Sequence, residues 1–245
     1  MLGLPDSVHV CLFDLDGVLT DTASVHRAAW KDTFDPVLER HGQDPFTDDD
    51  YADYVDGKPR LDGTRDFLAS RHLDIPEGTD SDGPDDETVH GIAARKNDEV
   101  LAKIKRDGVK VYDGSRRYLE AARDAGLRRV VVSSSANTAQ VLHVTGLESL
   151  VEGRVDGNTI DEQGLHGKPA PDSFLAGAKL VDAAPGACVV FEDATSGVEA
   201  GHRGAFGYVV GVNRLDAHHA AELTEHGATV VVDDLSDLLD GGNDA

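Results

Sequence analysis

Two aspartates, Asp14 and Asp16, flank Leu15 at the end of a short apolar segment. Two carboxylates placed in this way can divide a reaction, because one can attack phosphorus as a nucleophile while the other delivers and removes protons. The same Asp-x-Asp pair also occurs as a solvated turn at the end of a strand. The pair alone therefore does not decide between chemistry and a turn, and the other polar residues of the chain have to be considered with it.

Further polar elements follow along the chain. Ser133 ends a run of valines, Lys168 precedes a proline, and Glu192 and Asp193 end another apolar segment. Phosphoryl transfer to a carboxylate brings two anions together, so such a site needs a divalent cation and fixed positive donors. Carboxylates are the hard ligands that Mg²⁺ prefers, while a hydroxyl and an ammonium can hold phosphoryl oxygens. Each element alone has an ordinary surface or capping interpretation, but together they predict a Mg²⁺-dependent phosphotransferase whose Asp14 is phosphorylated.

The elements that would position these residues are short buried strands. Residues 8–15 form an apolar run without helical periodicity that stops at Asp16 and Gly17, as expected for a parallel strand that ends in a loop. Similar runs alternate with amphipathic helical patterns, which predicts an α/β fold with a doubly wound, Rossmann-like parallel sheet. The other predicted strands are 129–132, 187–191, 208–212 and 229–232, and the helices between them are 115–125, 138–144 and 172–180.

The segment 23–107 differs from the rest because it shows helical patterns, at 24–40 and 88–106, without comparable buried strands. We therefore expect an α/β core domain from residues 1–22 and 108–245, and an inserted helical cap domain from residues 23–107. The insert begins directly after the first strand and its loop. It is expected to act as a lid near the carboxyl edge of the sheet, where ligands bind in open α/β folds.

In the order and context of these elements, the chain resembles the haloacid dehalogenase superfamily over nearly its whole length, and within it the β-phosphoglucomutase-like subfamily. The resemblance implies that Asp14 is the nucleophile and Asp16 the general acid and base. It implies that Ser133 and Lys168 stabilise the transferring phosphoryl group. It also implies a Mg²⁺ ion, for which the expected ligands are Asp14, Asp16 through its backbone carbonyl, Glu192 and Asp193.

Within the insert, Thr22, His26 and Trp30 fall one helical turn apart and can form one face, although a helix packed on a neighbour gives the same spacing. The sequence Gly-Lys-Pro-Arg ending at Arg60 resembles the family's loop whose arginine binds the phosphate that is not transferred. Lys96 resembles a residue that reaches the sugar. The residues expected to bind substrate are Thr22, His26, Trp30, Gly57, Lys58, Arg60, Lys96, Ser134, Ser135 and Asn137.

Two departures from the subfamily pattern affect the substrate. Ala136 stands where the pattern has a lysine, so binding of the distal phosphate is expected to be weaker or differently arranged. The Asp-rich segment 79–86 lengthens the insert, which leaves the sugar open. Neither this segment nor Asp48-Asp49-Asp50 follows the twelve-residue calcium-loop pattern, and both are interpreted as exposed loops.

The resemblance implies interconversion of β-glucose 1-phosphate and glucose 6-phosphate through a phosphoaspartate and β-glucose 1,6-bisphosphate. A sugar-phosphate phosphatase is the alternative enzyme, because it uses the same core residues and differs in that water attacks the phosphoaspartate. A dehalogenase is disfavoured by Asp16 as a proton shuttle. A noncatalytic sugar-phosphate sensor is disfavoured because every catalytic position is filled.

The composition excludes several classes of partner. A net charge of −23, from 46 acidic and 23 basic residues, repels nucleic acid and anionic membranes and suits a solvated surface in a salty cytoplasm. There is no apolar run long enough to span a bilayer and no secretory signal pattern at the N-terminus, so we expect a cytoplasmic protein. Cys11 and Cys188 lie in apolar runs and are expected to be buried, reduced thiols. We expect a monomer whose only partner is a small sugar phosphate.

Overall fold

The computed structural model describes residues 2–240, and the chain divides into two compact units. The first, here called the core unit, comprises Met1–Asp21 and Lys110–Ala245, and the second, the helical unit, comprises Thr22–Val109. The predicted core segment reaches residue 245, and its last five residues lie outside the described ones. No helix within residues 2–240 combines the length and apolar character needed to cross a membrane.

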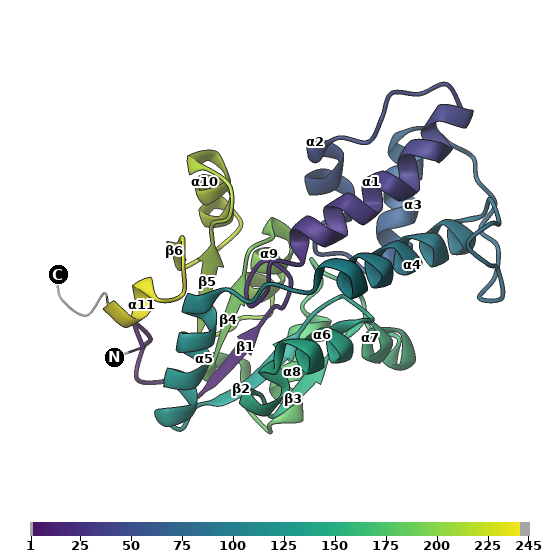
Figure 1. Cartoon of the computed structure of the whole chain (residues 1–245). Coiled ribbons are helices and arrows are strands. Elements are labelled where there is room, and N and C mark those ends of the chain that lie inside the picture. The colour runs from purple at the N-terminus through teal and green to yellow at the C-terminus, as the bar shows by residue number, and fades with distance from the viewer. Residues whose placement is uncertain (1, 241–245) are drawn as a thin grey trace. The chain divides into compact units, whose positions relative to one another are not determined.

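The core unit is built on a sheet in which every pairing is parallel, in the order β3-β2-β1-β4-β5-β6 (Figure 1). β1 is central, and Phe13 at its end stands opposite Val131 of β2 and Phe191 of β4. The chain first builds outward from β1 to one edge and then returns to build the other half, which makes the end of β1 a topological switch point. The predicted doubly wound sheet is confirmed. The strands are β1 (Val10–Phe13), β2 (Arg128–Val132), β3 (Gly153–Val155), β4 (Cys188–Glu192), β5 (Tyr208–Val212) and β6 (Val230–Val232).

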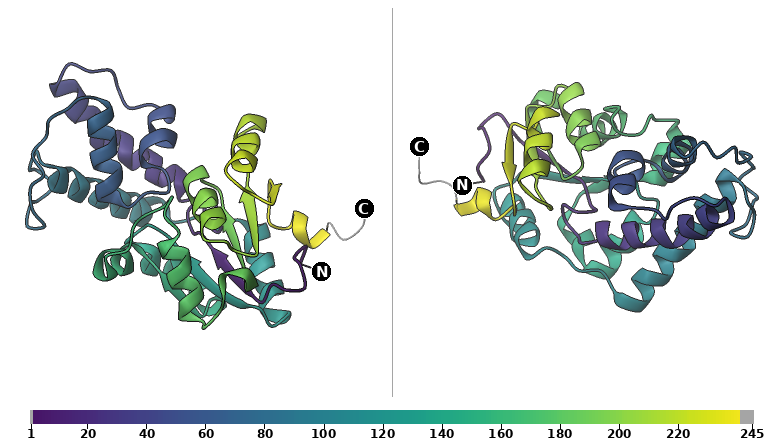
Figure 2. Two further views of the ribbon diagram at one scale, coloured as in Figure 1. Left: turned by 180° about the vertical axis from the view of Figure 1, so that it is seen from behind. Right: turned by 90° about the horizontal axis from the view of Figure 1, so that it is seen from above.

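Helices cover both faces of this sheet (Figure 2). On one face, Val10 and Leu12 pack with Phe174 of α8 in one apolar cluster. On the other face, Phe13 stacks on Phe191 at 4.5 Å between ring centroids, and Tyr118 of α5 meets both rings edge-on. Burial on both faces explains why the strands are apolar throughout. The helices of the core unit are α5 (Asp113–Asp124), α6 (Thr138–Thr145), α7 (Gly157–Gln163), α8 (Asp172–Leu180), α9 (Thr195–Arg203), α10 (Ala217–Glu225) and α11 (Asp237–Asp240), with 3₁₀ turns at Leu147–Leu150 and Pro185–Ala187.

The predicted elements differ from the structure at a few places. β1 ends at Phe13 rather than at residue 15, because the chain turns there and Asp14 begins the loop. The edge strand β3 was not predicted, since Gly153-Arg154-Val155 is too short and too polar to form an apolar run. Cys11 and Cys188 are buried free thiols, as expected, in adjacent strands.

The helical unit is held together by a group of aromatic rings. Phe34 contacts three of them, with centroid distances of 5.0 Å to Trp30, 5.4 Å to Phe46 and 4.2 Å to Phe67. All four side chains are buried, so this unit has an apolar core of its own. The elements of the unit are α1 (Ala23–Arg40), α2 (Asp48–Asp50), a π-helical turn η1 (Tyr51–Val55), α3 (Arg60–Ser70) and α4 (Val89–Asp107).

The interpretation of residues 48–50 as an exposed loop is wrong in two respects, because the segment is helical and Asp50 is buried, while Asp48 and Asp49 are exposed. Residues 48–50 form α2, and the carboxylate of Asp50 accepts hydrogen bonds from the backbone N–H and the hydroxyl of Thr47, each at 2.9 Å, in a capping box. Arg71 Nη2 donates to the same carboxylate at 2.5 Å, and Asp50 is only 8% exposed. Asp50 is buried because Arg71, far away in sequence, supplies the charge that a buried carboxylate requires.

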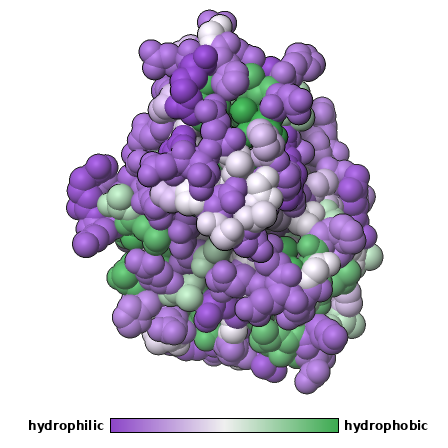
Figure 3. Space-filling model, turned by 90° about the vertical axis from the view of Figure 1, so that its right-hand side faces the viewer, coloured by the Kyte–Doolittle hydropathy of each residue, from purple (hydrophilic) through white to green (hydrophobic). Residues whose placement is uncertain are grey.

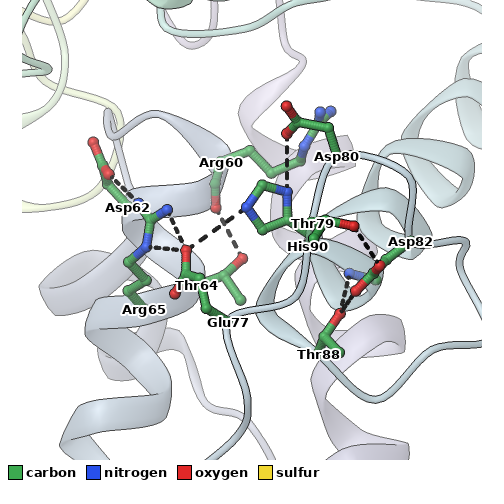
Figure 4. Close-up of polar contacts among 11 residues, drawn as sticks. Arg60, Asp62, Thr64, Arg65, Glu77, Thr79, Asp80, Asp82, Thr88 and His90 are labelled. Carbon is green, nitrogen blue, oxygen red and sulfur yellow. Dashed lines mark hydrogen bonds and ion pairs between the residues drawn. The ribbon is translucent and has the colours of Figure 1, made fainter.

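The Asp-rich loop is exposed as predicted, but it is tied down at both ends (Figure 4). The side chain of Asp80 is 99% exposed, whereas the carboxylate of Asp82 accepts hydrogen bonds from Thr79 and Thr88 at 2.9 and 2.6 Å. Arg65 binds Glu77 through two nitrogens at 2.9 and 2.5 Å. These contacts fix the extra length of the insert against α3 and the start of α4.

We predict that Asp50→Asn destabilises the helical unit by about 2 kcal/mol at pH 7, because hydrogen bonds to a charged group are lost. Burial alone would raise the pKa of Asp50, but hydrogen bonds from Thr47 and Arg71 outweigh it and hold the pKa below its usual range. This stabilisation is complete above the unfolded pKa of about 3.9 and disappears as the pH falls through the folded value. Urea unfolding followed by circular dichroism at pH 7 and pH 3 measures both effects.

The exposed Asp49 in the same helix supplies the control. Asp49→Asn should change the free energy of unfolding by less than about 0.5 kcal/mol. An equal loss in the two variants, or a loss for Asp50→Asn that does not shrink on acidification, would contradict the role given to Asp50.

We also predict that added salt stabilises the protein. The face drawn in Figure 3 is mostly hydrophilic with scattered apolar patches, and the chain carries a net charge of −23, so repulsion among surface carboxylates opposes folding. The Debye length shrinks from about 10 Å at 0.1 M salt to about 3 Å at 1 M, which screens this repulsion. The melting temperature should rise as KCl is increased over this range. A melting temperature that stays constant or falls as KCl is added would contradict the proposed repulsion among surface carboxylates.

Candidate active site

The first group of polar residues gathers where β1 and β4 end. Asp14 follows β1, and its backbone N–H donates to the carbonyl of Phe191 at 2.9 Å. Lys168, from the loop before α8, places its Nζ 2.6 Å from Asp14 Oδ1 and 2.5 Å from Glu192 Oε1. Asp14, Lys168 and Glu192 are all buried. A buried ammonium thus bridges two buried carboxylates that are 178 residues apart in sequence.

Asp16 and Ser133 join this group from neighbouring strand ends. Ser133 Oγ donates to Asp16 Oδ2 at 3.3 Å and accepts the backbone N–H of Ser135 at 3.1 Å. The hydroxyl is therefore oriented from both sides. The polar elements that the sequence pointed to, at the ends of β1, β2 and β4 and before α8, do come together within the core unit.

The turn after β1 needs a glycine at one position. Gly17 has φ +86°, and its backbone N–H closes the turn on the carbonyl of Thr20 at 2.7 Å. A Cβ on Gly17 would lie 1.8 Å from Asp193 Oδ2, which is an overlap. Only glycine allows the backbone after Asp16 to lie directly against the Asp193 carboxylate.

The charges at this site are unbalanced. Burial raises the pKa of Asp14 well above its usual range, and Glu192 and Asp16 raise it further, while Lys168 opposes them. Burial alone would lower the pKa of Lys168, but Asp14 and Glu192 outweigh it and raise that pKa. The carboxylates of Asp14, Glu192 and the half-buried Asp16 thus lie close together around a single ammonium. Such a site favours an additional cation.

The donor set leaves room for few direct metal contacts. Among residues 2–240, no three or more His, Cys, Asp or Glu side chains are arranged to hold a metal ion. Glu192 already uses one oxygen on Lys168 and the other on the backbone N–H of Ala194 at 2.8 Å. Mg²⁺ usually keeps several water ligands and binds a protein through only one or two carboxylates together with substrate phosphate. A site with few free carboxylate oxygens therefore suits Mg²⁺.

The predicted loop after β2 is mostly engaged with itself. Ser135 Oγ accepts the backbone N–H of Asn137 at 3.2 Å, and Thr138 Oγ1 donates to the Ser135 carbonyl at 2.7 Å. Ser134, Ser135 and Asn137 are partly exposed. The loop after β2 is therefore held by its own hydrogen bonds and carries partly exposed polar side chains next to Ser133.

A second group of predicted residues gathers inside the helical unit. Lys96 Nζ lies 2.8 Å from His26 Nδ1 and 4.8 Å from the centre of the Trp30 ring, and Lys96 is only 5% exposed. α1 and α4 therefore present His26, Trp30 and Lys96 together. Trp30 also belongs to the aromatic core of the unit, so part of the predicted face is packing. Thr22, directly before α1, is buried.

The predicted loop before α3 divides into separate contacts. Arg60 Nη1 donates to Asn97 Oδ1 at 2.7 Å, next to Lys96 in α4. Lys58 Nζ pairs instead with Asp66 at 2.7 Å, and Gly57 takes φ +68°. Asn97 was not singled out from the sequence. Its only signal was its place beside Lys96.

Arg214 was also missed. It follows β5 and contacts the backbone of the turn that carries Asp16, with Nε donating to the Gly17 carbonyl at 2.6 Å. The available signal was a charged residue two positions after a buried strand, close to the context that marked Asp14 and Glu192. It was weaker because the residue type, arginine, did not fit a carboxylate-based site.

Comparisons with known proteins agree with this fold. A family model described as haloacid dehalogenase-like hydrolase matches residues 8–204. The chain belongs to this family. The resemblance inferred from the motifs is thereby confirmed.

Individual relatives are more specific. The chain is 56% identical to a β-phosphoglucomutase of Mycobacterium tuberculosis over 98% of its own length and 94% of the relative's. It is 30% identical to hexitol phosphatase A of Escherichia coli over 78% of the chain and 76% of the relative. A crystal structure of β-phosphoglucomutase from Clostridium difficile superposes with a TM-score of 0.75, covers 94% of this chain and 93% of that one, and is 24% identical, a likeness that concerns the fold.

We predict that Lys168→Met destabilises the core unit by about 3–5 kcal/mol in the presence of a chelator, because Asp14 and Glu192 are left buried without their cation. The loss should shrink as the pH is lowered and Asp14, whose pKa burial already raises, takes up a proton. Guanidinium unfolding at several pH values measures it. Lys179→Met, at an exposed position of α8, is the matched control and should lie within about 0.5 kcal/mol of the unmodified protein. A Lys168 variant as stable as this control would contradict the bridge.

Proposed function

We propose that this protein is a β-phosphoglucomutase that interconverts β-glucose 1-phosphate and glucose 6-phosphate through a phosphoaspartate and β-glucose 1,6-bisphosphate. The observation that carries the proposal is 56% identity, over 98% of the chain, to a protein of that name. The core unit supports it, because a carboxylate nucleophile, a second carboxylate, a hydroxyl and an ammonium meet at the end of the central strand.

In this proposal Asp14 attacks a phosphorus of the bound bisphosphate, which leaves a phosphoaspartate and a sugar monophosphate. The phosphoaspartate then passes its phosphoryl group to a hydroxyl of the next sugar monophosphate, which forms the bisphosphate again. Asp14 Oδ1 lies against Lys168 Nζ, which stabilises negative charge on the phosphoryl oxygens as the bond forms. Asp16 protonates the departing sugar oxygen and later takes the proton from the attacking hydroxyl, and Ser133 holds its carboxylate in place. The bisphosphate then reorients and returns its other phosphate to Asp14.

We propose Mg²⁺ as the cofactor, held by Asp14, Asp193, the backbone carbonyl of Asp16 and, through its remaining lone pairs, Glu192. The carboxylates gathered around Asp14 support this assignment. Bound there, the ion would neutralise charge on the phosphoryl oxygens. Glu192 has the further task of fixing Lys168, which its hydrogen bond at 2.5 Å supports.

We assign substrate binding to the predicted residues of both units. Arg60 grips the phosphate that is not transferred, and its contact with Asn97 orients the guanidinium. His26, Trp30 and Lys96 recognise the sugar, for which a buried cation beside an aromatic ring and an imidazole is suited. In this proposal the helical unit is the cap domain inferred from the sequence. Thr22, Gly57 and Lys58 shape its loop ends, and Ser134, Ser135 and Asn137 line the distal phosphate site.

The protein is proposed to work as a monomer in the cytoplasm, without nucleic acid or membrane partners. The net charge of −23 supports the absence of polyanionic partners. Buried free thiols in Cys11 and Cys188 are compatible with a reducing compartment.

A sugar-phosphate phosphatase is the second candidate, favoured by the 30% identity to hexitol phosphatase A. The two activities share the phosphoaspartate and differ in whether a sugar hydroxyl or water attacks it. The sugar accepted by either activity depends on the residues of the helical unit.

The test supplies β-glucose 1-phosphate, Mg²⁺ and a trace of the bisphosphate, and follows glucose 6-phosphate and inorganic phosphate together. We expect glucose 6-phosphate to dominate, removal of Mg²⁺ with a chelator to stop the reaction, and Asp14→Asn to lower turnover on the order of 10⁴-fold or more without loss of fold. Dominant phosphate release would favour the phosphatase. Unchanged turnover in Asp14→Asn would rule out the phosphoaspartate.

A further inference from the structure

The turn that carries Asp16 is braced by a residue outside the four motif elements. Arg214 Nε donates to the carbonyl of Gly17 at 2.6 Å, and its Nη2 donates to the carbonyl of Val18 at 3.3 Å. Gly17 and Val18 are the two residues directly after Asp16. The guanidinium therefore binds the backbone directly after Asp16, and this part of the backbone determines where the Asp16 side chain lies.

Arg214 is itself held on two further sides. Its guanidinium carbon lies 3.8 Å from the centre of the Tyr112 ring, and its Nη1 donates to the carbonyl of Asp233 at 2.9 Å. Asn213, the preceding residue, is fixed to Asp233 through its side chain at 2.8 Å. A planar fork with donors in fixed directions is preorganised for such a task, and lysine cannot reproduce it.

Two further groups contact the same turn. Ser115 Oγ donates to the Val18 carbonyl at 2.6 Å, and the Asp193 carboxylate lies against the α-carbon of Gly17. Arg214 thus sets the position of the Gly17 backbone between its own guanidinium and a proposed metal ligand. A shift of the turn would move the Asp16 carboxylate away from Ser133, whose hydrogen bond to it is already long at 3.3 Å.

We propose that Arg214 is a positioning residue for proton transfer by Asp16. This inference rests on the proposed function, and in particular on Asp16 as the general acid. Arg214 does not touch the transferring group; it acts through the backbone of Gly17 and Val18. Positioning of this kind affects the rate steeply, because a displacement of about 1 Å can lower it on the order of 100-fold.

The role can be separated from a general structural one through the leaving group. When a sugar phosphate phosphorylates Asp14, a bond forms from Asp14 to phosphorus, the bond from phosphorus to the sugar oxygen breaks, and that oxygen takes a proton from Asp16. When acetyl phosphate is the donor, the same bond to Asp14 forms and acetate departs as a stable anion without needing a proton. Only the first reaction depends on the position of Asp16.

The experiment measures single-turnover phosphorylation of Asp14, by acid-trapped phosphoenzyme, with β-glucose 1,6-bisphosphate and with acetyl phosphate in the presence of Mg²⁺. We expect Arg214→Met to slow the reaction with the sugar bisphosphate about 10- to 100-fold and the reaction with acetyl phosphate less than about twofold. Arg214→Lys should restore only part of the rate. Arg123→Met, which removes an exposed arginine paired with Asp124, is the matched control and should change neither rate.

Equal slowing with both donors would show a structural role only and overturn the proposal, as would unchanged rates with both. If Arg214→Met does not fold, Arg214→Lys carries the same comparison, because it keeps the charge and lacks the fork. If the unmodified enzyme accepts a phosphoryl group from acetyl phosphate and not from the bisphosphate, the proposed mutase function fails. The Arg214 comparison is then made with a sugar phosphate that the enzyme hydrolyses.

Discussion

The buried ammonium of Lys168 between Asp14 and Glu192 is the interaction on which the core unit depends. It joins the loop before α8 to the ends of the two central strands, and it supplies a positive charge between two carboxylates that lie away from water. Such a bridge gains little stability compared with an apolar core, because desolvation of three charges offsets their attraction. Its importance lies in the arrangement that it imposes, because it holds the proposed nucleophile Asp14, the Lys168 ammonium and the Glu192 carboxylate next to one another.

Around this bridge, the residue types are those that the backbone conformation and the hydrogen bonds of the site require. The turn from Asp14 to Thr20 places a positive φ at Gly17 and leaves no space for a side chain there. The Ser133 hydroxyl donates a hydrogen bond to Asp16 and accepts one from the backbone of its own loop. The apolar strands on either side provide the rigidity, since Phe13 and Phe191 stack directly behind the site. The reacting groups are thereby carried by short loops on the most buried elements of the unit.

Most of this arrangement was accessible from the sequence, because parallel strands end at one edge and a polar residue after each buried run must face its neighbours there. Asp14, Ser133 and Glu192 were found by that rule. What escaped were pairs whose partners share no local pattern, such as Asp50 with Arg71 and Arg214 with Gly17. A carboxylate in an acidic run is taken for solvated until the distant arginine is known. The edge strand β3 escaped for a different reason, because an edge position accepts polar residues that a central strand excludes.

The order of the strands has a consequence for how the protein is made. The central strand β1 is completed by residue 13, but its two neighbours are β2, which begins at Arg128, and β4, which begins at Cys188. During synthesis the helical unit, with its own aromatic core, emerges and can fold before either neighbour exists. The first strand of this sheet therefore waits longest for its partners, and Asp14 acquires its surroundings only after Glu192 has left the ribosome. Until β2 emerges, β1 is an unpaired apolar segment, and we expect chaperones to bind there.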